Sequence, residues 1–302
     1  MQSKIFFIVA ILFVVIVNAT SHPKFRVIQG VDDEDNKYPY VVCLARLQTQ
    51  VPGLELYRGC TGTLIAPEWV LTAAHCLVPE LQLDIVRYGN MSIPRNATDS
   101  TRRILKRIPH PNYKGALFIE SIDLCKNDIG LVLVEEIQMM VLGKISSVDY
   151  RTLSGQKVTY AGYGRTGKRK KNKSLEIQES LVDEFKPLQL GKCMIRSCPQ
   201  YLKFWSVLCA VPKCTSKGHR PSDRDSGGPL FLDDKVVAVL TGVKFLIIHD
   251  KLLYVLYTPV SPYLDWIRTT VNTHESAETR RVRRNNISRD PLVGDLESIR
   301  VL

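Results

Sequence analysis

The sequence predicts an all-β protein in which two packed barrels form a single unit. Short runs rich in aliphatic and β-branched residues, such as residues 41–45 and 62–66, alternate with turns of Pro, Gly, Asn and Asp. All-β chains of about this length, here 302 residues, often fold as one unit of this kind. One long helical pattern follows the leader, and it begins only near residue 261. These three observations together favour an all-β barrel fold.

The chain opens with a pattern typical of a secretory signal peptide. Residues 5–17 are an apolar run behind Lys4, and Val17-Asn18-Ala19 provides a cleavage pattern of small residues. The run is too short to favour a transmembrane helix, and no later stretch approaches about 18 uninterrupted apolar residues. We therefore expect residues 1–19 to be removed and the remainder to be secreted, without a membrane partner.

Patterns later in the chain predict two further strands, a helix and a polar tail. Strands are expected at residues 157–164 and 235–241, and a helix at 261–267 with Pro262 at a permitted early position. Beyond residue 274 the composition becomes polar, so residues 275–302 are expected to form a flexible tail. Its basic cluster 280–284 is either a processing site for a proprotein convertase or a solvated run of charge.

The eight cysteines favour disulfides in an oxidising compartment. Their number is even, and none has the spacing of a zinc knuckle, so we expect no metal and no cofactor. Connectivity cannot be deduced from the spacing alone.

Three short segments supply the residue types of nucleophilic catalysis. Ser226 lies in Asp-Ser-Gly-Gly-Pro, His75 in Thr-Ala-Ala-His-Cys, and Asp128 in Asn-Asp-Ile-Gly-Leu. A serine hydroxyl is a poor nucleophile until an imidazole takes its proton, and the imidazole needs an acid to fix its tautomer. The sequence therefore predicts Ser226 as nucleophile, His75 as base and Asp128 as the orienting acid.

The order His, Asp, Ser along the chain resembles that of the trypsin/chymotrypsin-like serine proteases. The resemblance covers about residues 27–270. It implies two packed antiparallel six-stranded β-barrels with a C-terminal helix, in a protease domain spanning residues 27–274. It also implies that the backbone N–H groups of Ser226 and Arg224 hold the oxyanion of the reaction.

The resemblance further implies a zymogen. Residues 20–26 would form a propeptide, which an activating protease cuts after Arg26. The new α-amino group of Val27 would then pair with Asp225, organising the oxyanion site because either charge alone would be costly to bury.

The disulfides that the resemblance implies are Cys60–Cys76 and Cys193–Cys209. A pairing of Cys125 with Cys198 is a further hypothesis, on the ground that the family packs the loops holding them close together.

Several positions depart from the family pattern. Arg224 stands where the family has glycine, a residue that tolerates backbone conformations costly for others. Arg220 occupies the aspartate position of trypsins, which disfavours trypsin specificity. The pocket walls are expected at Val243 and Val255, and Thr241 replaces a serine that bonds the family's catalytic aspartate. A preference for small aliphatic or for acidic side chains remains open.

Charge and modification motifs indicate further partners. The net charge is +11, and the basic segment 165–173 is either a site for an acidic glycan, a protein inhibitor or another acidic partner, or merely solvated. Nucleic acid is a poor match, because no aromatic platform accompanies this segment. Sequons for N-glycosylation lie at Asn90, Asn96, Asn172 and Asn286.

Two functional interpretations follow. The first is a secreted serine endopeptidase acting on a protein or peptide substrate, because the three catalytic residue types and the activation pair are present. The alternative is a protease-like binding protein with weak or no turnover, which would account for Arg224 and the altered pocket.

Overall fold

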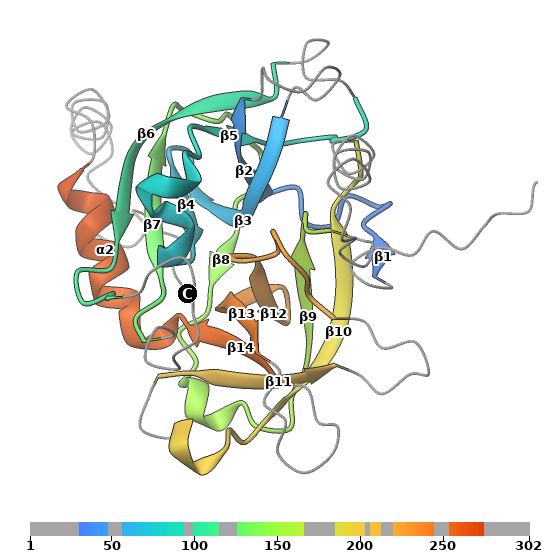
Figure 1. Cartoon of the computed structure of the whole chain (residues 1–302), viewed down its shortest axis with the longest axis vertical. Coiled ribbons are helices and arrows are strands. Elements are labelled where there is room, and N and C mark those ends of the chain that lie inside the picture. The colour runs from blue at the N-terminus through green and yellow to red at the C-terminus, as the bar shows by residue number, and fades with distance from the viewer. Residues whose placement is uncertain are drawn as a thin grey trace, which may run out of the picture.

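A computed structural model describes most of the chain and places the elements in two barrels (Figure 1). It describes residues 30–47, 56–93, 99–114, 126–165, 185–202, 206–212, 220–244 and 254–274. The predicted signal peptide, propeptide and tail lie outside these residues.

The first barrel is a closed ring of six antiparallel strands in the order β2-β3-β4-β7-β6-β5. Its strands are β2 (Val41–Leu47), β3 (Leu56–Ala66), β4 (Trp69–Thr72), β5 (Ile85–Arg87), β6 (Thr101–Pro109) and β7 (Gly130–Val134). Aliphatic side chains from these strands fill the interior; Val41, Leu44, Leu64, Leu71, Val86 and Leu131 have no exposed surface. Such β-branched and aliphatic residues suit the pleated, half-buried surface of a strand.

The second barrel closes in the order β9-β10-β11-β14-β13-β12, because β9 pairs with both β10 and β12. Its strands are β9 (Lys157–Gly162), β10 (Gln189–Arg196), β11 (Leu208–Pro212), β12 (Pro229–Leu232), β13 (Lys235–Lys244) and β14 (Tyr254–Pro259). Two short strands add to this ring: β1 (Val31–Asp32) pairs with β10, and β8 (Lys144–Ile145) with β13. The prediction of two six-stranded barrels is confirmed.

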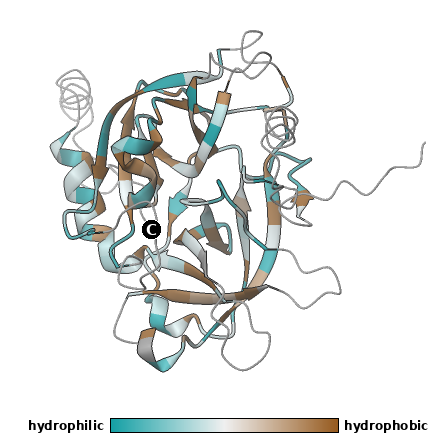
Figure 2. Ribbon diagram, viewed as in Figure 1, coloured by the Kyte–Doolittle hydropathy of each residue, from teal (hydrophilic) through white to brown (hydrophobic). Residues whose placement is uncertain are grey.

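The predicted C-terminal helix is present but begins slightly later than expected. Ser261–Tyr263 form a single 3₁₀ turn containing Pro262, and α2 (Leu264–Thr273) follows it. One side of α2 is buried through Ile267 and Val271, which belong to the core of the first barrel. Figure 2 shows hydrophilic residues on the outer side of this helix and hydrophobic residues along the strands of both barrels. None of the described helices is long and apolar enough to cross a membrane.

An aromatic cluster joins the two barrels. The ring of Tyr38 stacks on that of Phe231 in β12, with 4.3 Å between centroids, and Tyr40 meets both rings edge-on. Aromatic pairs contribute about 0.5–1.5 kcal/mol beyond their buried area. The barrels are therefore fixed against each other, which matters because the predicted catalytic residues come from both.

Candidate active site

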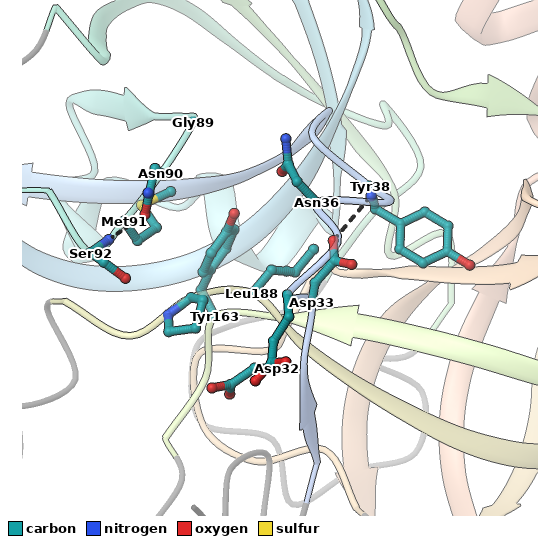
Figure 3. A pocket seen from close by; sticks show the side chains of 12 residues that line it. Asp32, Asp33, Asn36, Tyr38, Gly89, Asn90, Met91, Ser92, Tyr163 and Leu188 are labelled. Carbon is teal, nitrogen blue, oxygen red and sulfur yellow. Dashed lines mark hydrogen bonds between the residues drawn. The ribbon is translucent and has the colours of Figure 1, made fainter.

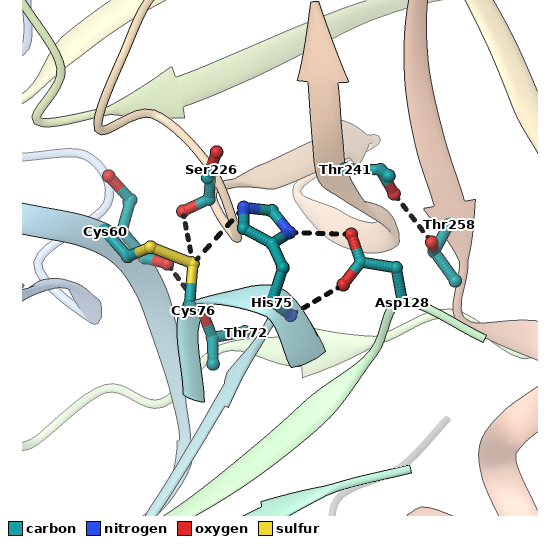
Figure 4. Close-up of polar contacts among 9 residues, drawn as sticks. Cys60, Thr72, His75, Cys76, Asp128, Ser226, Thr241 and Thr258 are labelled. Carbon is teal, nitrogen blue, oxygen red and sulfur yellow. Dashed lines mark hydrogen bonds and ion pairs between the residues drawn. A yellow bond between two sulfur atoms is a disulfide. The ribbon is translucent and has the colours of Figure 1, made fainter. Parts of the chain in front are cut away.

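The first barrel positions His75 and Asp128. His75 lies in a short 3₁₀ helix, Ala74–Leu77, directly after β4, and Asp128 comes just before β7. Because Thr72 of β4 pairs with Gly130 of β7, the two segments start from adjacent points of the barrel. Oδ2 of Asp128 lies 2.8 Å from Nδ1 of His75, and Oδ1 accepts the His75 backbone N–H at 2.8 Å (Figure 4). This two-point contact fixes both the ring orientation and the helix that carries it.

The pair is shielded from water. The side chain of Asp128 is 0 % exposed and that of His75 13 %. Burial alone would lower the pKa of His75, but the charge of Asp128 and its hydrogen bond to the ring outweigh this and raise the pKa above 6.5. The carboxylate therefore stabilises the protonated form of the His75 ring.

The second barrel supplies Ser226 on a tight turn before β12. The backbone oxygen of Ser226 accepts the N–H of Thr61 in β3 at 2.9 Å, which ties the turn to the first barrel. Gly227 follows with φ +78°, and a Cβ there would lie 2.0 Å from Oγ1 of Thr72. Only glycine fits this close approach, which places Ser226 beside His75 (Figure 4). Within the described part of the chain, no hydrogen bond joins the Ser226 hydroxyl to the imidazole.

The predicted Cys60–Cys76 disulfide is confirmed. It links β3 to the short helix carrying His75, so His75 is held to the barrel on both sides. Both sulfurs lie near His75, but their bond leaves no thiolate for a metal ion.

Asp225 is buried beneath the Ser226 turn. Its carboxylate accepts backbone N–H groups from Gly164 at 2.7 Å and from Ser222 at 2.8 Å, and the hydroxyl of Ser222 at 3.3 Å. Burial raises the pKa of Asp225 to about 7, although these hydrogen bonds act in the opposite direction. Arg26 and Val27, the other members of the predicted activation pair, lie outside the described residues.

Arg224 adopts the backbone conformation expected of the glycine that it replaces. Its φ is +78°, in the left-handed region, which costs a non-glycine residue about 1–3 kcal/mol. The carbonyl of Arg224 accepts the Thr61 hydroxyl at 3.1 Å, and the guanidinium lies over the ring of Tyr57, 4.8 Å from its centroid. The contact with Tyr57 was not predictable from local patterns, because β3 and the Ser226 turn are more than 160 residues apart.

The residues expected around the substrate pocket do not gather into one described cavity. Arg220 is partly buried just before Ser222, whereas Val255 is 1 % exposed and belongs to the core of the second barrel, so it has no free surface with which to line a pocket. The side chain of Val243 lies outside the described residues. The hydroxyl of Thr241 lies 2.7 Å from that of Thr258 instead of bonding Asp128, so the expected contact is wrong.

The second predicted disulfide, Cys193–Cys209, is wrong. Cys209 is bonded to Cys198, and the buried Cys193 is a free thiol. In the pairing of β10 with β11, Cys209 lies opposite Arg196, whereas Cys193 lies opposite Pro212. The three-residue offset amounts to about 10 Å along the strand, beyond the reach of a disulfide. The hypothesis pairing Cys125 with Cys198 is also wrong, because Cys198 is bonded to Cys209; Cys125 lies outside the described residues.

Only the first residue of the basic segment 165–173 is described. Arg165 is 5 % exposed. Its backbone N–H donates to the carbonyl of Asp223 at 3.0 Å, and its backbone carbonyl accepts the Ser222 hydroxyl. It thus braces the loop before Ser226. Among the sequons, Asn90 is exposed, and its Oδ1 accepts the Ser92 N–H at 2.9 Å. Asn96, Asn172 and Asn286 lie outside the described residues.

A cavity of about 380 Å³ is lined by residues other than the predicted catalytic ones, and Figure 3 shows its lining side chains. Asp32, Asp33, Tyr38, Asn90, Tyr163 and Leu188 are among the residues that line it. Neither His75, Asp128 nor Ser226 contributes to its wall. Sequence reasoning singled out Asn90 but not this cavity, whose acidic lining residues Asp32, Asp33 and Glu34 lie at the end of β1 and directly after it.

Two closed barrels bring a buried acid, its imidazole and a serine together, and this arrangement defines a class of two-barrel proteins. A family model described as Trypsin matches residues 27–267, so the chain belongs to the trypsin family. Human kallikrein-8 is 30 % identical over 72 % of this chain and 80 % of its own length. Rat granzyme M is 27 % identical over 82 % of this chain and 89 % of its own length. Human chymotrypsin-like elastase family member 3A is 25 % identical over 84 % of this chain and 92 % of its own length.

Proposed function

We propose that this protein is a secreted serine endopeptidase that hydrolyses peptide bonds through an acyl-enzyme. The observation that carries the proposal is the two-point contact between Asp128 and His75, with Ser226 adjacent to the ring. In the reaction, Oγ of Ser226 attacks the peptide carbonyl while His75 accepts its proton. His75 then donates that proton to the leaving amine, and water releases the acyl group by the reverse sequence.

The oxyanion would be held by the backbone N–H groups of Ser226 and Arg224. Such donors act in a site of low dielectric, where they contribute more than in water. For proton transfer, Oγ of Ser226 must come within hydrogen-bond reach of Nε2 of His75. Rotation about the Ser226 Cα–Cβ bond changes this distance at low cost, and catalytic hydrogen bonds often tighten only with substrate bound.

Activation by cleavage after Arg26 is part of the proposal. Asp225 is a buried carboxyl whose pKa is raised to about 7, and no ion pair with it is found within the described ranges. The ammonium group of Val27 would supply the missing charge and favour the ionised carboxylate. The leader at residues 1–19 and the disulfides support secretion.

The partners follow from this chemistry. We expect a protein or peptide substrate, an activating protease, and a protein inhibitor or acidic glycan at segment 165–173. Small aliphatic or acidic residues are the candidate preferences at the scissile bond. Asn90 is the exposed sequon best supported as a glycosylation site, and a mass shift on treatment with a glycosidase at that peptide tests it.

A second candidate is a protease-like binding protein with little turnover. It is favoured by Arg224, a strained residue at an oxyanion position, together with the lack of a Ser226–His75 hydrogen bond in the described structure. This candidate would bind a partner at the same site without the rate enhancement.

Labelling with a biotinylated fluorophosphonate separates the two candidates. The secreted chain is cleaved after Arg26, incubated with the probe, and compared with the Ser226→Ala variant. Rapid labelling of the wild type alone supports the endopeptidase. A correctly cleaved, folded protein that remains unlabelled contradicts it and supports the binding protein.

A further inference from the structure

The side chain of Arg224 is stacked on Tyr57 of β3. The centre of the guanidinium lies 4.8 Å from the centroid of the Tyr57 ring, within the range of a cation–π contact. Arg224 is 7 % exposed and Tyr57 is partly buried, so the contact is largely shielded from water. Shielding strengthens such an interaction, because the charge no longer has bulk water as an alternative partner.

The backbone of Arg224 is held by the same strand. Its carbonyl accepts the Thr61 hydroxyl at 3.1 Å, and the Thr61 N–H donates to the carbonyl of Ser226 at 2.9 Å. The hydroxyl oxygen of Thr61 is itself fixed, because it accepts the backbone N–H of Tyr163 at 3.0 Å. Both ends of the segment 224–226 are therefore fastened to β3.

Two fixed directions at one tetrahedral carbon determine the others. Thr61 fixes the direction of the Arg224 carbonyl, and Tyr57 restrains the side chain that leaves through Cβ. The Arg224 nitrogen must then take its remaining place on Cα, and the observed φ of +78° about the N–Cα bond sets the direction of its N–H. A glycine would adopt this conformation without strain, whereas an arginine needs a compensating contact.

We propose that Tyr57 is a positioning residue for the oxyanion site: its ring holds the Arg224 side chain so that the strained backbone at residue 224 keeps its N–H directed as an oxyanion donor. The inference rests on the proposed function. Tyr57 touches no reacting atom and acts through Arg224. The arginine is tolerated at this position because the stack offsets the strain and draws the side chain over β3.

The test is a double-mutant cycle on the cleaved enzyme, read as the second-order rate of fluorophosphonate labelling and as kcat and KM for a small peptide ester. Tyr57→Leu should lower the labelling rate and kcat about tenfold with little change in KM, a part of the hundredfold or more lost when an oxyanion donor is removed. Tyr57→Phe keeps the ring and should restore most of the rate. In the Arg224→Gly background, Tyr57→Leu should change the rate less than about twofold, because glycine needs no stack.

Arg46 provides the matched control, since its guanidinium lies 4.7 Å from the centroid of the same ring. Arg46→Leu removes a cation from Tyr57 without touching the segment 224–226, so labelling should stay within about twofold of wild type. Equal loss from Tyr57→Leu in both backgrounds, or no loss in either, overturns the proposal.

Failure of the proposed function gives a different pattern. If the wild type is never labelled, the endopeptidase proposal fails, and the same cycle is read as the melting temperature of the four proteins. Tyr57→Leu should then lower the melting temperature more with Arg224 present than in the Arg224→Gly background. Equal shifts in the two backgrounds overturn the stack as a determinant of the loop conformation.

Discussion

The backbone N–H of Gly164 donates a 2.7 Å hydrogen bond to Oδ1 of Asp225, and a Cβ at Gly164 would lie 2.4 Å from the carboxyl carbon of that residue. Glycine is thus required at residue 164 for the carboxylate to approach the backbone after β9. Gly162 is constrained in the same way, with 2.1 Å from its Cβ position to Oδ1 of Asp225. The segment after β9 and the Ser226 turn are consequently built around one buried acid.

Gly164→Ala should displace Asp225 and the turn that carries Ser226. Overpacking a buried site costs about 1–3 kcal/mol, so the melting temperature should fall by about 3–10 °C. Fluorophosphonate labelling of the cleaved protein should fall at least tenfold. Gly242→Ala is the control, because no atom lies within 4 Å of a Cβ there, and its melting temperature should be unchanged. Equal melting temperatures for both variants would contradict the role of Gly164.

Asp225 should make the uncleaved protein less stable as pH rises from about 4 to 7. Its pKa is about 7 in the folded protein and 3.8 as an unperturbed group, so over this range the folded state holds a proton that the unfolded state has released. Stability falls with pH wherever the folded state binds more protons. Urea unfolding at several pH values measures this, and Asp225→Asn should remove most of the slope. Cleavage after Arg26 should also remove it, because the Val27 ammonium would favour the ionised carboxylate; a slope that survives cleavage argues against that pair.

The labelling rate should fall as pH drops through the pKa of His75, which lies above 6.5. The base must be neutral to accept the Ser226 proton, so protonation of the ring removes activity. In Asp128→Asn the charge is gone and burial remains, which should move the midpoint below 6.5. The labelling rate at neutral pH should fall by about 10⁴, as kcat does when the aspartate of a Ser-His-Asp triad is replaced by asparagine. Asp99→Asn alters an exposed acid paired with Arg102 and should leave the profile unchanged; a wild-type midpoint below 6.5 would refute the assignment.

The Cys198–Cys209 disulfide should stabilise the protein by about 2–3 kcal/mol, since it closes a short loop of the second barrel. The double variant Cys198→Ser/Cys209→Ser should lower the denaturant midpoint accordingly. Burial raises the pKa of Cys193 to about 12, so iodoacetamide should modify this thiol only after unfolding. Peptide mapping without reduction identifies the disulfide partners and the alkylation state of Cys193. A Cys193–Cys209 peptide, or rapid alkylation of Cys193 in the native protein, would show that this arrangement is wrong.

The barrels, the Cys60–Cys76 bond and the approach of His75 to Asp128 were all predictable from the sequence. The barrels depend on a local pattern of alternating strands and turns, and the approach of His75 to Asp128 on residue types in a characteristic order, whereas the disulfide followed only from the resemblance to the trypsin/chymotrypsin-like serine proteases. The second disulfide was not predictable, because it depends on which residues of β10 and β11 lie opposite each other. A shift of three residues along one strand changes which sulfurs can meet. The assignments of Val255 and Thr241 failed similarly, since the direction of a side chain on β13 or β14 is set by packing within the barrel.

What the sequence by itself determined is the set of chemical groups: a serine, an imidazole and two acids, with an arginine in place of glycine at residue 224. Local patterns also determined the all-β class, because strand-forming runs and turn residues act over a few positions. Only the tertiary structure decided that Asp225 is buried against Gly162 and Gly164, and that Tyr57 stacks on Arg224. These contacts join segments more than 60 residues apart. The burial of Asp225, the raised pKa of its carboxyl group and the strained backbone of Arg224 arise only when such segments pack together.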